Sequence, residues 1–234
     1  MTKHSVHFEK QIGKLKKMIL SLSAMVEESL RTSLISIEKR NTPLAMKVIE
    51  SDAEVDRLEV ELEEECLKTL ALYQPIFAND LRLIVAILKI NNDLERIADL
   101  AVNIAERSID LSRQGTWQIP SAFKEMGDKA QWMLKAALDA FIGLDAGLSR
   151  RICAADDEVD GFLRAMYLKT EKEIREQPDL LNRLIHFLSV CRYIERIADH
   201  VTNIAEDVIY MVEGEIVRHK SEFLQPREDE DKRK

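Results

Sequence analysis

Acidic side chains at four-residue spacing are the feature of this sequence that could carry chemistry. Residues 94–106 read LERIADLAVNIAE. On a helix that turns 100° per residue, Glu95, Asp99 and Asn103 lie within about 80° of one another. Like charges four residues apart destabilise a helix by roughly a few tenths of a kcal/mol. We therefore expect a positive group to offset the repulsion along this face.

The acidic pattern is repeated. Residues 194–206 read IERIADHVTNIAE and match nine of the thirteen positions of 94–106 at an offset of one hundred residues. Upstream, DAEVD at 52–56 matches DDEVD at 156–160 at an offset of 104. Each half of the chain thus has two acidic stretches, which packing could bring together. The further candidate donors are Asp52, Asp56, Asp156, Asp160, Glu195, Asp199 and Asn203, with Glu59 and Glu63 extending the first stretch.

Two kinds of positive group could balance these carboxylates. Arg96 and Arg196 each precede an aspartate by three residues, so both stripes could be solvated surfaces with local ion pairs. Alternatively, carboxylates from two adjacent helices could hold a cation. Oxygen-only ligand sets suit Mg²⁺, Ca²⁺, Mn²⁺ or iron. The spacing alone leaves both interpretations open.

Other reactive arrangements are absent from the sequence. Glu-x-x-His, HExxH and a phosphate-binding glycine loop do not occur, and no nucleophile–base arrangement can be identified. Cys66, Cys153 and Cys191 lie far apart with no CxxC, which indicates small core residues rather than a zinc or disulfide framework. The net charge of −8 disfavours general nucleic-acid binding.

No membrane segment is predicted. The N-terminal residues lack an apolar signal region, and the longest strongly apolar run, 81–90, is about half the length of a membrane span. We expect a cytoplasmic protein that contacts a membrane only through partners.

Helical periodicity dominates the elements that must position the acidic residues. Thr42-Pro43 is typical of a helix start, whereas Pro75, Pro178 and Gly214 indicate helix ends. The expected helices cover 6–40, 42–73, 79–113, 121–148, 151–176 and 179–213.

The repeat divides these helices into two similar halves. We predict an all-α fold of two tandem three-helix bundles, because each helix has one apolar stripe to bury. The predicted domains are 1–115 and 116–224, followed by a charged, disordered tail at 225–234.

Almost the whole chain resembles the PhoU family of bacterial phosphate-transport regulators. Two copies of ERIAD followed by NIAE in a tandem helical chain are highly specific. The resemblance rests on Phe8, Gln11, Leu15, and the segments 52–59, 74–75, 80–82, 88–90, 94–99, 192–200, 202–206 and 208–210.

This resemblance implies two bundles side by side, a cytoplasmic homodimer and a regulatory role. PhoU-like proteins couple the phosphate ABC transporter, through its ATPase subunit, to the phosphate-sensing histidine kinase. They hold the phosphate-starvation response off when phosphate is plentiful. The family's acidic motifs bind metal, as iron or zinc clusters or with Mg²⁺ or Mn²⁺. They fall here on Asp52, Asp56, Glu95, Asp99, Asp156, Asp160, Glu195 and Asp199, with Asn103 and Asn203 as further ligands.

Two other functions compete with a non-enzymatic regulator. One is a carboxylate-bridged metalloenzyme, hydrolytic or redox, with a general base at Glu95 or Glu195 and a metal-bound water. The other is a helical adaptor of a different phosphate carrier. Two complete motif halves without membrane spans favour the stand-alone regulator.

Overall fold

The computed structural model describes residues 3–73, 76–115 and 118–217, with side chains from residue 7 onward. These residues form long α-helices joined by short turns, as the sequence predicts. The helices are α1 Lys3–Glu38, α2 Thr42–Leu72, α3 Ala78–Ser112, α4 Ser121–Gly143, α5 Ala146–Glu176 and α6 Leu181–Glu213, with a 3₁₀ turn, η1, at Pro178–Leu180. Pro75, Trp117 and the predicted tail at 225–234 lie outside the described residues.

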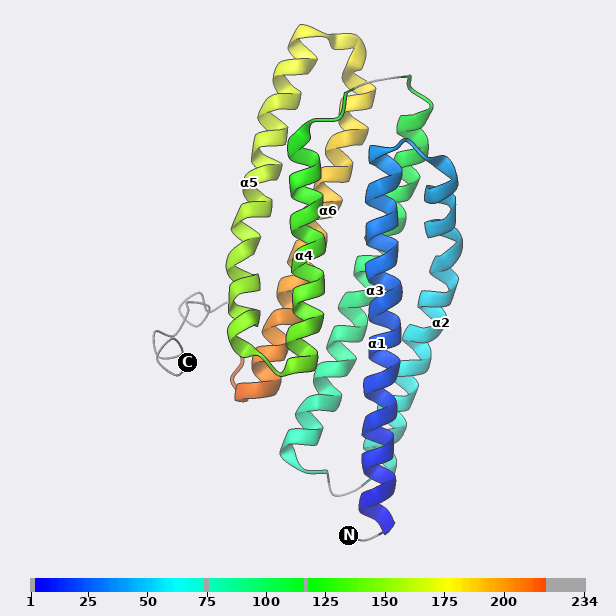
Figure 1. Cartoon of the computed structure of the whole chain (residues 1–234), viewed down its shortest axis with the longest axis vertical. Coiled ribbons are helices and arrows are strands. Elements are labelled where there is room, and N and C mark those ends of the chain that lie inside the picture. The colour runs from blue at the N-terminus through cyan, green and yellow to red at the C-terminus, as the bar shows by residue number, and fades with distance from the viewer. Residues whose placement is uncertain (1–2, 74–75, 116–117, 218–234) are drawn as a thin grey trace.

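The helices form two three-helix bundles placed side by side (Figure 1). α1, α2 and α3 pack together on one side, and α4, α5 and α6 pack together on the other. α3 packs along α6, and α1 also contacts α4, so each bundle contributes two helices to the contact between bundles. The predicted all-α architecture of two three-helix bundles is confirmed.

The apolar core runs through both bundles without a break. Its buried members extend from Leu15 on α1 to Met211 on α6, and Phe123 and Phe187 pack together with their ring centroids 5.4 Å apart. The long apolar stripe of every helix explains this, because each helix must cover that stripe against a neighbour. The two bundles therefore share one core.

Polar pairs show that α3 and α6 run antiparallel. Lys89 Nζ lies 2.8 Å from Asp207 Oδ1 near one end, and Arg107 Nη1 lies 3.1 Å from His186 Nδ1 near the other. Midway between these pairs, the register places residues 97–98 opposite residues 197–198. These are the Ile-Ala pairs of the two repeated motifs, and all four residues are buried. The repeats thus meet at a pseudo-twofold axis.

Two helix starts differ from the sequence prediction. Asn41, not Thr42, is the N-cap of α2, and its side chain accepts a hydrogen bond from Leu44 N at 3.1 Å. α4 ends at Gly143, where Leu144 takes a left-handed conformation, and Asp145 caps α5 by accepting from Leu148 N at 2.8 Å. The expected break near 148–151 was therefore wrong, because Leu144 in a left-handed conformation ends α4 earlier and Asp145 then caps α5.

Several other expectations are met. Gly214 ends α6 with φ 77°, as a glycine C-cap predicts. Cys66 and Cys191 are buried and Cys153 is partly buried; all three are free thiols. Burial raises the pKa of each thiol to about 12, so they are unreactive core residues.

Candidate functional site: two acidic clusters

The first-half carboxylates lie at the contact between α2 and α3. Burial raises the pKa of Asp52, and the charges of Asp56 and Asp99 add to that rise. The pKa of Glu95 is likewise raised by burial first and then by Asp99, with smaller contributions from Glu59 and Asp56. These mutual effects show that the structure brings the four predicted residues together. We call Asp52, Asp56, Glu95 and Asp99 the first acidic cluster.

The second-half carboxylates occupy the corresponding contact between α5 and α6. Burial, followed by the charges of Asp199 and Asp160, raises the pKa of Asp156 to about 7. Burial and the nearby Asp199 and Asp160 also raise the pKa of Glu195. Burial and Asp160 raise that of Asp199, although His200 and Arg196 oppose the rise. We call Asp156, Asp160, Glu195 and Asp199 the second acidic cluster.

The two predicted asparagine ligands use their amide groups differently. Asn103 Nδ2 donates to the backbone carbonyl of Asp99 at 2.8 Å, within its own helix. Asn203 Nδ2 instead donates to Asp93 Oδ1 at 3.3 Å, across the contact between the bundles. Each asparagine stands four residues after an aspartate of its cluster, so both lie on the acidic face of their helix.

The local arginines balance only part of the negative charge. Arg96 Nε lies 3.3 Å from Glu95 Oε2, and Arg96 Nη1 lies 3.4 Å from Asp99 Oδ2. Arg164 Nη1 lies 3.6 Å from Asp160 Oδ2. The side chains of Arg96 and Arg164 are both more than half exposed, and exposed pairs contribute little. The raised pKa values remain despite them, so each cluster is a site where a proton or a cation would be stabilised.

The second cluster contains an acceptor that suits a cation. Asp156 Oδ1 is buried and has no hydrogen-bond partner among the described residues. A buried carboxylate oxygen without a donor carries an unrecovered desolvation cost, which a metal ion would offset. The donor chemistry therefore fits a hard or borderline cation. In the described part of the chain, however, no three His, Cys, Asp or Glu side chains already surround one point.

Sequence reasoning missed Asp93. This α3 residue is only 5 % exposed, and its Oδ1 lies 2.8 Å from His200 Nδ1 as well as near Asn203. Burial of Asp93 on the side of α3 that faces α6 could have been inferred from helical phase, since Asp93 lies four residues before the buried Ile97.

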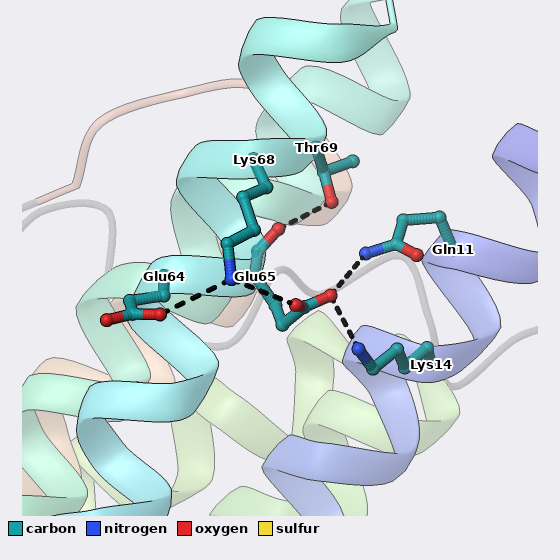
Figure 2. Close-up of polar contacts among 6 residues, drawn as sticks. All are labelled: Gln11, Lys14, Glu64, Glu65, Lys68 and Thr69. Carbon is teal, nitrogen blue, oxygen red and sulfur yellow. Dashed lines mark hydrogen bonds and ion pairs between the residues drawn. The ribbon is translucent and has the colours of Figure 1, made fainter.

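A further acidic residue of α2 shows what a fully paired carboxylate looks like in this protein. Glu65 accepts hydrogen bonds from Lys14 at 2.6 Å and Gln11 at 2.9 Å on α1, and Lys68 approaches it from its own helix (Figure 2). These hydrogen bonds lower the pKa of Glu65 to about 2. Glu65 thus fastens α2 to α1, whereas the part of the chain that the structure describes offers the cluster carboxylates no such set of donors.

The fold and the clusters together define a class of protein: a duplicated three-helix bundle with one acidic cluster per repeat. No helix among the described residues is long and apolar enough to cross a membrane. The family model of the PhoU domain matches this sequence at residues 19–108 and 123–208, one match in each bundle. The chain belongs to the PhoU family.

Relatives and solved structures agree along nearly the whole chain. A protein of Thermotoga maritima described as a phosphate-specific transport system accessory protein, PhoU homolog 1, is 35% identical over 94% of this chain and 93% of its own. The corresponding homolog of Aquifex aeolicus is 36% identical over 90% of this chain and 95% of its own. The crystal structure of PhoU from Pseudomonas aeruginosa superposes with a TM-score of 0.84 at 33% identity, covering 89% of this chain and 100% of that one.

Proposed function

We propose that this protein is a cytoplasmic, non-enzymatic regulator of phosphate uptake. In this role it docks on the ATPase subunit of the phosphate ABC transporter and on the phosphate-sensing histidine kinase, and it represses the phosphate-starvation response when phosphate is plentiful. The support is the family membership and the accessory role by which the relatives are described. Those descriptions name a transport accessory and no reaction.

Metal binding by the two acidic clusters is the second part of the proposal. The observation that carries it is the buried, unpartnered Asp156 Oδ1 within a group of four carboxylates. Iron, zinc, Mn²⁺ and Mg²⁺ are the candidate ions, and Asn103 and Asn203 add neutral oxygen donors. A cation bound in each cluster offsets part of that cluster's negative charge and thereby orders the surface that the partners meet. The proposed assembly is a homodimer.

Deletion of the gene tests the regulatory role. Phosphate-starvation genes are expected to be expressed at high phosphate in the deletion strain, and the wild-type gene should restore repression. Normal repression without the gene would reject the role. Co-purification of the kinase and the ATPase subunit from the native host then identifies which partners the chain contacts directly.

Elemental analysis tests the metal part of the proposal. Protein purified without chelator is expected to carry metal, and the double variant Asp99→Ala with Asp199→Ala should lose most of it. Replacing Glu54 and Glu171 by Ala is the matched control, because both are exposed helix carboxylates outside the clusters. Equal metal content in the cluster variant and the wild type would favour the solvated-surface interpretation.

A further inference from the structure

Asp93 joins the first bundle to the second next to the second acidic cluster. Its side chain extends from α3 and is only 8% exposed. The same oxygen, Oδ1, lies 2.8 Å from His200 Nδ1 and 3.3 Å from Asn203 Nδ2, both on α6. A buried carboxylate needs donors, and these two side chains provide them.

This contact fixes the orientation of the Asn203 amide. The hydrogen bond runs from Asn203 Nδ2 to Asp93 Oδ1, so Asn203 turns its NH₂ group toward Asp93. Its carbonyl oxygen then points away from Asp93. Because Asn203 stands four residues after Asp199, the two side chains share a face of α6. An amide oxygen that turns away from α3 is available to a ligand bound on the acidic side of α6.

We propose that Asp93 is a positioning residue that holds Asn203 as an oxygen donor to a cation in the second acidic cluster. Asp93 itself does not contact the cation. Outer carboxylates that orient the ligands of a metal in this way are a general feature of metal sites. This inference rests on the proposed metal binding and adds a residue from the opposite bundle to it.

The first cluster has no equivalent support. The position one hundred residues from Asp93 is Tyr193, and that from His200 is the buried Leu100. Within the described ranges, Asn103 donates to the backbone carbonyl of Asp99 in its own helix, 2.8 Å away, and to no residue of the other bundle. The effect of Asp93 is therefore specific to the second cluster, which makes the two clusters distinguishable by mutation.

Binding of Mn²⁺, followed through the electron paramagnetic resonance signal of the free ion, tests the proposal in full-length protein. Asp52→Asn with Asp99→Asn removes the first cluster and leaves the second to be measured. In this background we expect Asp93→Asn to weaken Mn²⁺ binding by roughly tenfold or more, the usual effect of losing an outer carboxylate. With the second cluster removed instead by Asp156→Asn and Asp199→Asn, Asp93→Asn should leave binding at the first cluster unchanged.

A double-mutant cycle separates positioning from structural damage. Asn203→Ala alone should weaken the second cluster about as much as Asp93→Asn, and the two together should cost no more than either one. Tyr193→Phe, at the counterpart position, is the control and should change nothing. Asn203→Ala leaves the contact between Asp93 and His200 in place, so it remains informative even where Asp93→Asn reduces stability.

Four results would overturn the inference. Unchanged Mn²⁺ affinity in Asn203→Ala would show that the amide is not a donor. Additive losses in the double variant would show that Asp93 acts directly or through the fold. Absence of Mn²⁺ binding by the wild type would reject this inference together with the proposed metal binding. If the wild type binds Mn²⁺ and Asp93→Asn binds it equally well, only this inference is rejected.

Discussion

The two acidic clusters derive from the same repeated motif, yet their surroundings differ. In the second cluster Asp156 has a buried oxygen without a partner and a pKa raised to about 7. The equivalent residue of the first cluster, Asp52, also has a raised pKa. Among the described residues, however, neither of its carboxylate oxygens is both buried and without a hydrogen-bond partner. A duplicated motif thus sets which residues can meet, while the neighbouring side chains decide how strongly charge is disfavoured there.

A second difference lies beside the clusters. In the first bundle, Asn91 on α3 donates to both the backbone carbonyl and the carboxylate of Glu59 on α2, each at 3.0 Å. At the corresponding positions the second bundle has Cys191 and Leu163, which are apolar. A polar contact between α2 and α3 therefore lies beside the first cluster, whereas apolar side chains lie beside the second.

The largest expected effect is on the stability of metal-free protein when Asp156 is neutralised. Because the folded pKa of Asp156 is raised, this carboxyl destabilises the folded state once it is ionised, so its contribution to wild-type stability should fall as the pH rises from about 4 to about 7. Asp156→Asn removes this loss and should gain about 2 kcal/mol at pH 8, after allowance for solvent screening of a partly exposed group. Urea unfolding with chelator present, at pH 5 and pH 8, measures both quantities.

Asp52→Asn is the matched variant for that experiment. We expect a gain of the same sign but smaller at pH 8, since no oxygen of Asp52 is both buried and unpartnered. Equal gains from the two substitutions would mean that the clusters have equivalent environments, contrary to the comparison above.

An intermediate effect is expected at Asn91. Asn91→Ala removes the donor to Glu59 and should cost about 1–2 kcal/mol, because the Glu59 carboxylate loses a partly buried hydrogen bond. Introducing the second bundle's residues, Asn91→Cys with Glu59→Leu, should restore stability to within about 1 kcal/mol of wild type, because both polar partners are then gone. A double variant no more stable than Asn91→Ala would show that the apolar pair does not fit the first bundle.

The smallest effect is expected at Glu65, whose pKa is shifted in the opposite direction from that of Asp156. Because its folded pKa is lowered to about 2, Glu65 stabilises the protein above pH 4.5 and loses this contribution as the pH falls toward 2. Lys14 is half exposed, so Lys14→Met should cost less than about 1 kcal/mol at pH 7. Carboxyl titration by NMR should show the Glu65 pKa rising in that variant, while the Asp156 pKa stays near 7.

Much of the fold and the membership of the clusters follows from local sequence. Helical phase and the two offsets were enough to group Asp52 with Asp99 and Asp156 with Asp199. Residues whose role depends on the contact between bundles could not be assigned this way. Asp93 and His200 are more than one hundred positions apart, and only the antiparallel register of α3 and α6 brings them together. The α4–α5 boundary was missed because Leu144, a residue not expected in a left-handed conformation, ends α4.

The pseudo-twofold axis between residues 97–98 and 197–198 has a consequence for how such a molecule can change over time. In a symmetric dimer of identical subunits, every substitution occurs twice and must be tolerated at both places. Here the two copies belong to one chain, so position 93 can be an aspartate while its counterpart, position 193, is a tyrosine. Covalent linkage of the repeats thus allows each half to carry different residues beside the interface they share.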